Sequence, residues 1–187
     1  MTPALIFLFV LLALPVLYVI VTYNGLVAIR NHIRDAWANI DTELKRRYDL
    51  IPNLVETTKG YAKHERETLE RVITLRNQCR ANTGRVVEQA ATETQLVSSL
   101  NGLFALAEGY PDLKANTNFQ QLQAELINTE DRIQAARRFY NGNVRDYRNK
   151  AQSFPANMVA GMLGFPPDAE DFFEVEPVER ESVRVQL

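Results

Sequence analysis

The first part of the chain is an uninterrupted apolar run. Residues 4–21 read ALIFLFVLLALPVLYVIV, with no charged side chain and only the Tyr18 hydroxyl as a polar side-chain group. At about 1.5 Å per residue a helix of this length covers roughly 27 Å, close to the roughly 30 Å of a hydrocarbon core. Pro15 lies inside the run, but membrane helices tolerate proline, often with a kink. The sequence therefore predicts a transmembrane anchor over residues 1–21.

Two other interpretations of an N-terminal apolar run are a cleaved signal peptide and a buried core helix. A signal peptide needs a basic first region and small residues at its cleavage site. Met1, Thr2 and Pro3 carry no basic side chain, and the residues after the run read TYNG. A core helix is disfavoured because the run is unbroken and stands at the terminus.

Basic residues follow the run and none precedes it. Arg30 and Arg34 lie within about 15 residues of the span, with Asp35 as a partial offset. The positive-inside rule then predicts a single-pass protein whose N-terminus is outside and whose bulk faces the cytoplasm. Tyr18 and Tyr23 stand where aromatic belts occur in membrane proteins.

Beyond the anchor, apolar residues recur at three- and four-residue intervals, which is typical of helices. Ile33, Trp37, Ile40 and Leu44 begin this pattern and predict a first helix over about residues 22–48. That helix is either continuous with the anchor or loosened by the asparagine and glycine that follow Tyr23.

Three further helices follow, separated by short loops that contain Gly, Pro or Asn. The charged stretch KHERE around His64 interrupts the apolar pattern of the second helix. Long helices with short connections pack as antiparallel neighbours, so we expect an all-α fold, an up-and-down antiparallel four-helix bundle with long, coiled-coil-like helices over residues 22–165. The predicted helices cover about residues 52–81, 85–108 and 119–147.

Pro52 in YDLIPNLVE has two interpretations. Proline disfavours a helical conformation at Ile51 and cannot donate a backbone hydrogen bond, while Asp49 is suited to cap a new helix. The apolar register nevertheless runs through the proline without a phase jump, as in a single kinked helix. We favour a tight turn at this point over a continuous helix.

The last part of the chain changes composition. FPANMVAGMLGFPP, after Ser153, predicts a short apolar helical turn, and residues 166–187 form an acidic, peripheral tail in which Phe172 and Phe173 are suited to dock on the bundle. Only residues 182–187 resemble a strand. The tail's acidic residues are Asp168, Glu170, Asp171, Glu174, Glu176, Glu179 and Glu181, against Arg180 and Arg184.

Composition and soft ligands exclude several function classes. The chain is 46% hydrophobic and 24% charged with a net charge of −2, which suits a folded protein and argues against a nucleic-acid surface. Cys79, His32 and His64 lack metal-ligand spacing, and the zincin pattern fails because position 68 is Thr68. We predict no catalytic, cofactor-binding or metal-binding residue and no cofactor.

Some polar and aromatic residues still need an interpretation. The helical carboxylates are best explained by intrahelical ion pairs, and Trp37 by core packing. Arg46 and Arg47 form either a solvated helix end or a contact with lipid head groups. Tyr140 belongs to the bundle packing. The carboxylates are Glu56, Glu65, Glu67 and Glu70.

Two long segments of the chain resemble a known family. The block TYNGLVAIRNHIRDAWANIDTELKRRYDLIPNLVETTKGYAKHERETLE is similar to the signature of the LemA family of bacterial membrane proteins, above all in RRYDLIPNLV. A later segment, AEGYPDLKANTNFQQLQAELINTEDRIQAARRFYNGNVRDYRN followed by FP and GF, resembles the second half of the same family, above all in YPDLKAN. The resemblance extends to about Phe173. It implies a membrane helix followed by a four-helix domain, and no established reaction or cofactor; one branch of the family is linked to magnetosome formation, and some members are encoded near HtpX-type proteases.

Three functions are consistent with these observations. The first is a membrane-anchored helical scaffold that self-associates or recruits protein partners at the membrane. The second is an enzyme whose site is assembled from dispersed groups such as Glu65, Glu67 and Tyr140. The third is a channel or transporter subunit, which a lone span without an intramembrane charge makes the weakest. We favour the scaffold.

Overall fold

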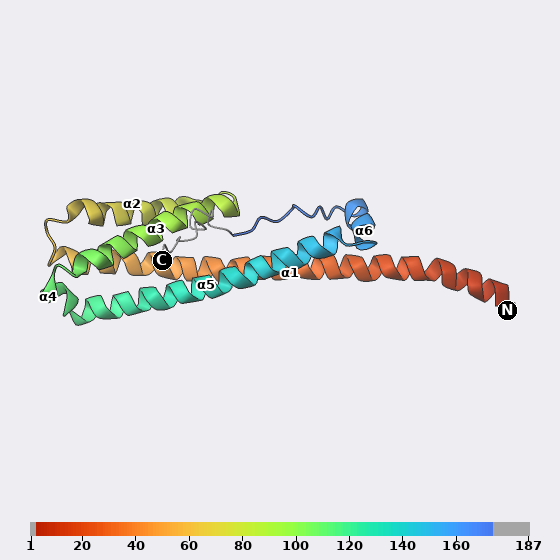
Figure 1. Cartoon of the computed structure of the whole chain (residues 1–187), viewed down its shortest axis with the longest axis horizontal. Helices are drawn as coiled ribbons and strands as arrows, with labels where there is room; N and C mark the ends of the chain where they lie inside the picture. The colour runs from red at the N-terminus through yellow and green to blue at the C-terminus, as the bar shows by residue number, and fades with distance from the viewer. Residues whose placement is uncertain (1–2, 174–187) are drawn as a thin grey trace, which may run out of the picture. The chain divides into compact units, whose positions relative to one another are not determined.

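The computed structural model describes residues 3–173, and every regular element in this part of the chain is a helix. The predicted all-α class is therefore confirmed (Figure 1). The strand-like residues 182–187 and the acidic residues from Glu174 onward lie outside the described part. The helices are α1 (Pro3–Lys59), α2 (Arg66–Ala81), α3 (Val86–Ala107), α4 (Pro111–Lys114), α5 (Thr117–Gln152) and α6 (Ala156–Met162).

The chain forms two compact units, and both combine segments that are distant in sequence. Unit 1 consists of Met1–Ile40 and Ala136–Asp171, and unit 2 of Asp41–Ala135 and Phe172–Leu187. Helices α1 and α5 each contribute to both units, so each unit is described by itself below.

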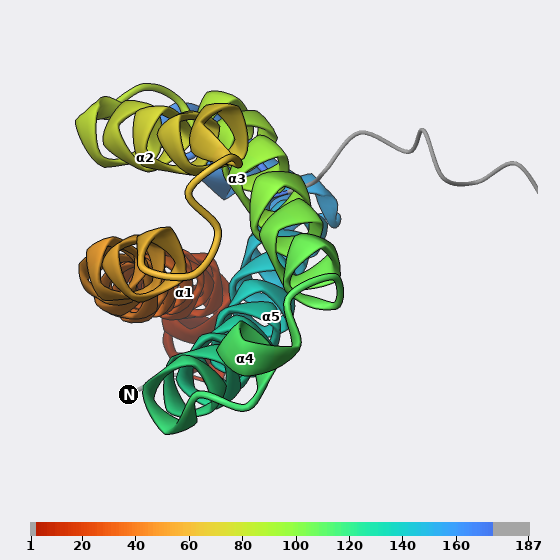
Figure 2. The ribbon, with the colours of Figure 1, turned by 90° about the vertical axis from the view of Figure 1, so that its left-hand side faces the viewer.

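Unit 2 consists of four long helical segments and the short helix α4 around an apolar core. Residues 41–59 of α1, helices α2 and α3, and residues 117–135 of α5 lie side by side (Figures 1 and 2). Loops at residues 60–65 and 82–85 reverse the chain between successive helices, as short connections predict. The fully buried side chains of this core include Ile51, Leu54, Val72, Leu96, Leu103, Leu113, Phe119 and Ile133.

The turn that we predicted at Pro52 is wrong. Helix α1 continues through this proline to Lys59, and the reversal comes at residues 60–65, just before and within the charged stretch that contains His64. Proline removes the hydrogen bond to the carbonyl four residues earlier, which is that of Tyr48. Here the Arg76 Nε of α2 donates to the Tyr48 carbonyl at 3.0 Å. Because Ile51 and Leu54 are fully buried, packing also favours a continuous helix over a turn.

Arg76 is therefore expected to stabilise the helix only as long as Pro52 is present. We expect Arg76→Ala to lower the free energy of unfolding by about 1–2 kcal/mol, because it leaves a part-buried carbonyl without its charged donor. In a Pro52→Ala background the amide at position 52 supplies the bond, so the same change should cost clearly less. Urea denaturation of the four proteins of this double-mutant cycle measures the coupling; equal costs in both backgrounds would contradict the assignment.

Unit 1 joins the first part of α1 to the last part of α5, to α6 and to the segment that follows α6. The predicted helix over residues 119–147 is confirmed within α5, and the short turn after Ser153 is α6. Trp37 is half-buried and its ring centroid lies 5.7 Å from that of Tyr140. Both residues therefore serve packing, as predicted.

Candidate functional site

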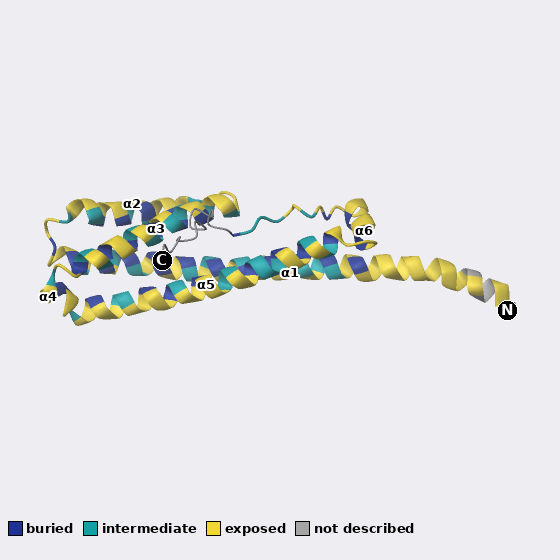
Figure 3. Cartoon of the chain, in the orientation of Figure 1, coloured by how far each residue is buried: buried dark blue, intermediate teal, exposed yellow. Residues whose placement is uncertain are grey.

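The clearest candidate is the start of α1 in unit 1, which has no protein cover. Every described side chain between positions 3 and 21 is exposed, and Phe9 and Leu12 are 72% and 64% exposed (Figure 3). Burial begins at Thr22 and is complete at Leu26. Within the described residues this helix alone is long and apolar enough to span a membrane, with a mean hydropathy of 2.1 over its most apolar window. Apolar surface of this extent needs an apolar solvent or partner.

Within unit 1, Arg30 of α1 contacts both α5 and the segment that follows α6. Its guanidinium carbon lies 4.4 Å from the ring centroid of Phe165 and 5.7 Å from that of Tyr147. It also donates to the Tyr147 hydroxyl at 3.2 Å, and its Nε lies 3.8 Å from a Glu170 carboxylate oxygen. Burial raises the pKa of Glu170, although Arg30 and Arg34 act in the opposite direction. These contacts attach the segment after α6 to α1 and α5.

Unit 2 contains a buried charged network. Arg47 of α1 donates to Glu93 of α3 and, through Nη1, to Glu130 of α5 at 2.6 Å. The side chains of Arg47 and Glu93 are only 3% and 4% exposed. The Tyr48 hydroxyl donates to the same Glu93 carboxylate, and burial is the main reason why the pKa of Tyr48 is raised. The network pairs these charges within unit 2 and links three helices, while the Nε of Arg47 is buried without a hydrogen-bond partner.

The network corrects our two interpretations of Arg46 and Arg47. Arg47 is neither at a solvated helix end nor available to lipid, because it is buried and lies about three turns before the end of α1. Arg46 is exposed and pairs with Glu125 of α5 at 2.8 Å. Sequence reasoning missed Glu93, although its spacing from Ala90 and Leu96 places a carboxylate on the apolar face of α3, where only a buried cation suits it.

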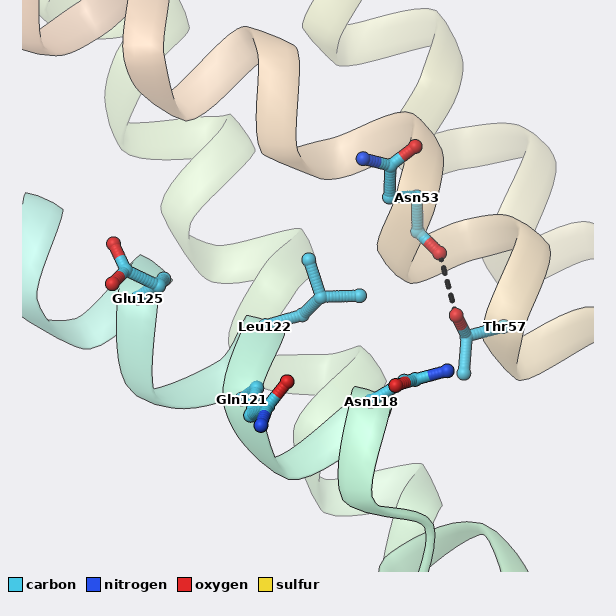
Figure 4. A pocket seen from close by; sticks show the side chains of 6 residues that line it. All are labelled: Asn53, Thr57, Asn118, Gln121, Leu122 and Glu125. Atoms are coloured by element: carbon cyan, nitrogen blue, oxygen red, sulfur yellow. Dashed lines mark hydrogen bonds between the residues drawn. The ribbon is translucent and has the colours of Figure 1, made fainter.

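A polar groove of about 380 Å³ lies between α1 and α5 in unit 2 (Figure 4). At its edge the Thr57 hydroxyl donates to the Asn53 carbonyl at 2.8 Å. Most of its polar side chains are amides, which donate and accept hydrogen bonds but do not titrate, and its carboxylate Glu125 is paired with Arg46. The groove therefore suits contact with a polar surface better than acid–base chemistry. It is lined by Asn53, Thr57, Asn118, Gln121, Leu122 and Glu125.

The helical carboxylates named from the sequence take structural partners. Glu56 pairs with Lys59 of α1 at 3.7 Å, and Glu70 pairs with Arg66 of α2 at 2.6 Å. Each pair lies within its own helix, as predicted. Glu65 instead accepts a hydrogen bond from the Tyr110 hydroxyl at 2.9 Å, between the start of α2 and the start of α4.

The other groups considered for chemistry are either exposed or held in a structural hydrogen bond. The Tyr140 hydroxyl donates to the Asp171 carbonyl at 2.9 Å in unit 1, and His32 is exposed in the same unit. Glu67 and His64 are exposed in unit 2. Over residues 3–173 no three His, Cys, Asp or Glu side chains come together as a metal site.

Cys79 is expected to be inert in the folded protein. It is buried in α2, and burial raises the pKa of its thiol to about 12, so the reactive thiolate is scarce at neutral pH. We expect a maleimide to label Cys79 only after unfolding in urea, whereas Glu67→Cys in a Cys79→Ala background should react at once in the native state. Intact-mass spectrometry measures both; fast native labelling of Cys79 would refute its burial.

Comparison with known proteins assigns the chain to a family. The sequence profile described as "LemA family" matches residues 36–187, which is most of the chain. The chain belongs to the LemA family. The resemblance seen in RRYDLIPNLV and YPDLKAN is thereby confirmed.

Individual LemA relatives extend this result. Protein LemA of Metamycoplasma hominis is 29% identical over 160 residues, which cover 86% of this chain and 72% of that protein. Magnetosome protein MamQ 2 of Paramagnetospirillum magneticum is 23% identical over 83% of this chain, and Magnetosome protein MamQ of Magnetospirillum gryphiswaldense is 20% identical over 76%. The chain spans 65% and 62% of these two magnetosome proteins, less than two thirds of their length.

Proposed function

We propose that this LemA family member is a membrane-anchored helical scaffold, which works by self-association or by recruiting protein partners at the membrane. In this proposal residues 1–21 form a single-pass transmembrane anchor, residues 22–165 the helical domain and residues 166–187 a C-terminal tail. The bulk of the chain faces the cytoplasm, and no step of catalysis is involved.

The uncovered start of α1 is the observation that supports this proposal most strongly. Protein contacts begin only at Thr22, so the apolar side chains before it have no cover from the described chain. A helix in hydrocarbon satisfies all its backbone hydrogen bonds internally, which makes a bilayer its natural environment.

Charges at the end of the apolar stretch support the cytoplasmic orientation. Arg30 and Arg34 follow the stretch on α1, and the last turns of α5 contribute Arg148 and Lys150 to the same unit. Lys150 extends its ammonium group against Gly25, four residues beyond the apolar stretch. Basic side chains next to a span favour the cytoplasmic side.

Several charged and polar side chains are engaged in contacts inside the fold, which favours a protein that acts by binding partners on its surface. Arg47 and Glu93 are enclosed by the fold, and Glu65 and Tyr140 are held in hydrogen bonds that join elements of their units. The polar groove on α1 and α5 remains open to a partner. The names of the relatives, Protein LemA and Magnetosome protein MamQ, are not names of enzymes.

Photo-crosslinking in native membranes tests the recruitment. A crosslinkable residue at Gln121 in the groove should capture a second copy or another protein, whereas the matched position Gln95, which is exposed on α3, should give far less product. A strictly monomeric protein in detergent, together with no crosslinked product at either position, would remove the support for a scaffold.

Thiol labelling tests the orientation, although not through the native cysteine, which is buried. In a Cys79→Ala background, Glu67→Cys places an exposed thiol on α2. A membrane-impermeant maleimide should label this thiol only after the cells are permeabilised. Labelling of intact cells would reverse the proposed topology.

A further inference from the structure

The segment around α6 presents apolar side chains that the fold does not cover. No charged residue occurs between Lys150 and Asp168. Ala156, Val159 and Ala160 of α6 are buried, so this short helix has a docked face. On the rest of α6, Met158 and Met162 are 61% and 84% exposed, and Phe154 and Leu163, which flank the helix, are 81% and 43% exposed.

Contacts within unit 1 place this segment next to the end of the uncovered stretch of α1. The Phe165 ring packs edge-on against the Tyr23 ring, with 5.6 Å between their centroids. The Tyr147 hydroxyl donates to the Pro166 carbonyl at 2.9 Å and fixes the chain after α6. Tyr23 is only two residues beyond Val21, or about 3 Å along the helix axis.

We propose that α6 and its flanks insert their exposed apolar side chains into the interfacial layer of the lipid bilayer, as a second membrane contact beside the spanning helix. This inference rests on the proposed anchor and goes beyond it, because it assigns lipid contact to a segment more than 130 residues later in the chain. An apolar helix face at the level of the head groups is stabilised by burial among the acyl chains.

Continuity with the anchor favours lipid over a protein as the occupant of this face. The described side chains of α1 are exposed up to Val21, and Phe165 lies beside the first turn that follows. A bilayer that surrounds the anchor therefore ends at the level of this segment. Tyr23 and Lys150 beside it are residues of the kinds that anchor proteins at membrane interfaces, where a lysine extends its charge to water.

Depth-dependent fluorescence quenching tests this contact in the full-length protein. Single cysteines in a Cys79→Ala background carry an environment-sensitive dye in vesicles of phosphatidylcholine and phosphatidylglycerol, with and without lipids that bear a quencher on the acyl chain. The test position is Met162→Cys, and Leu12→Cys reports on the anchor itself. The matched control is Asn39→Cys, which is exposed on the same α1 helix in unit 1, about 20 Å along the axis from Gly25.

We expect the dye at positions 12 and 162 to lose roughly half or more of its fluorescence to the quencher, and the dye at position 39 to lose little. Quenching at position 12 without quenching at position 162 would overturn the inference and leave the anchor intact. A dye at position 162 that is shielded from water but not quenched by lipid would assign this face to a second copy or another protein, and would also overturn it. No quenching at position 12 would refute the anchor, and the inference would fall with it.

Discussion

Replacement of Glu93 by alanine is expected to lower the free energy of unfolding by about 3–5 kcal/mol, because it leaves the buried Arg47 guanidinium with Glu130 as its remaining carboxylate partner. The Tyr48 hydroxyl loses its acceptor in the same change. Urea denaturation of the protein in detergent, followed by circular dichroism, measures the loss.

An exposed ion pair between the same two types of side chain provides the control. Glu125→Ala removes the partner of Arg46, and both of these side chains are nearly half exposed, so we expect a loss below about 1 kcal/mol. Replacement of both buried charges, Arg47→Met with Glu93→Leu, should recover much of the lost stability, since an apolar pair of similar volume needs no compensating charge, and the remaining loss reflects the Tyr48 hydroxyl without its acceptor. Equal losses for Glu93→Ala and Glu125→Ala would contradict the burial of the network.

Two charges in the apolar stretch of α1 are expected to abolish membrane insertion. Each arginine at the centre of a span costs about 2.5–3.5 kcal/mol, so Leu12→Arg with Val16→Arg should oppose insertion by roughly 6 kcal/mol. Leu12 and Val16 are both exposed on α1 and contact no protein core, so the helical units should still fold. Alkaline extraction of membranes should then release the variant, while the unmodified protein stays in the pellet.

Asn39→Arg is the matched control for this experiment. Asn39 is exposed on the same helix but lies well beyond the apolar stretch, and an arginine there should leave the protein in the membrane pellet. If the doubly substituted protein also stayed in the pellet, residues 1–21 would not be the anchor, and the proposed function would lose its main support.

Periodicity predicted the helices well because apolar spacing reports directly which face of a helix is buried. The long α5 and the short α6 both follow from their sequence patterns. Pro52 was misjudged because its cost is local, whereas its compensation comes from Arg76, which the chain brings back only in the next helix. No local pattern contains that information.

The exposed apolar stretch at the start of α1 was equally evident from the sequence, since its length and its lack of charge are local features of the chain. The Arg47 network was not, because a charge on a helix surface and a charge in a core look alike until the partner's position is known. Glu93 gave the one available signal, a carboxylate in line with Ala90 and Leu96. The placement of Phe165 beside Tyr23 depends on how α5 returns along α1, and tertiary packing alone fixes it.

Unit 1 combines Met1–Ile40 with Ala136–Asp171, so it can fold only after both segments have been synthesised. Leu26 and Ile33 are synthesised well before the part of α5 that belongs to unit 1, so unit 1 cannot bury them until residues 136–152 have been translated. With the proposed anchor over residues 1–21, a polypeptide arrested before Ala136 would lie in the bilayer with Leu26 and Ile33 still uncovered by the rest of unit 1. Such arrested products should be the preferred clients of chaperones and proteases at the membrane.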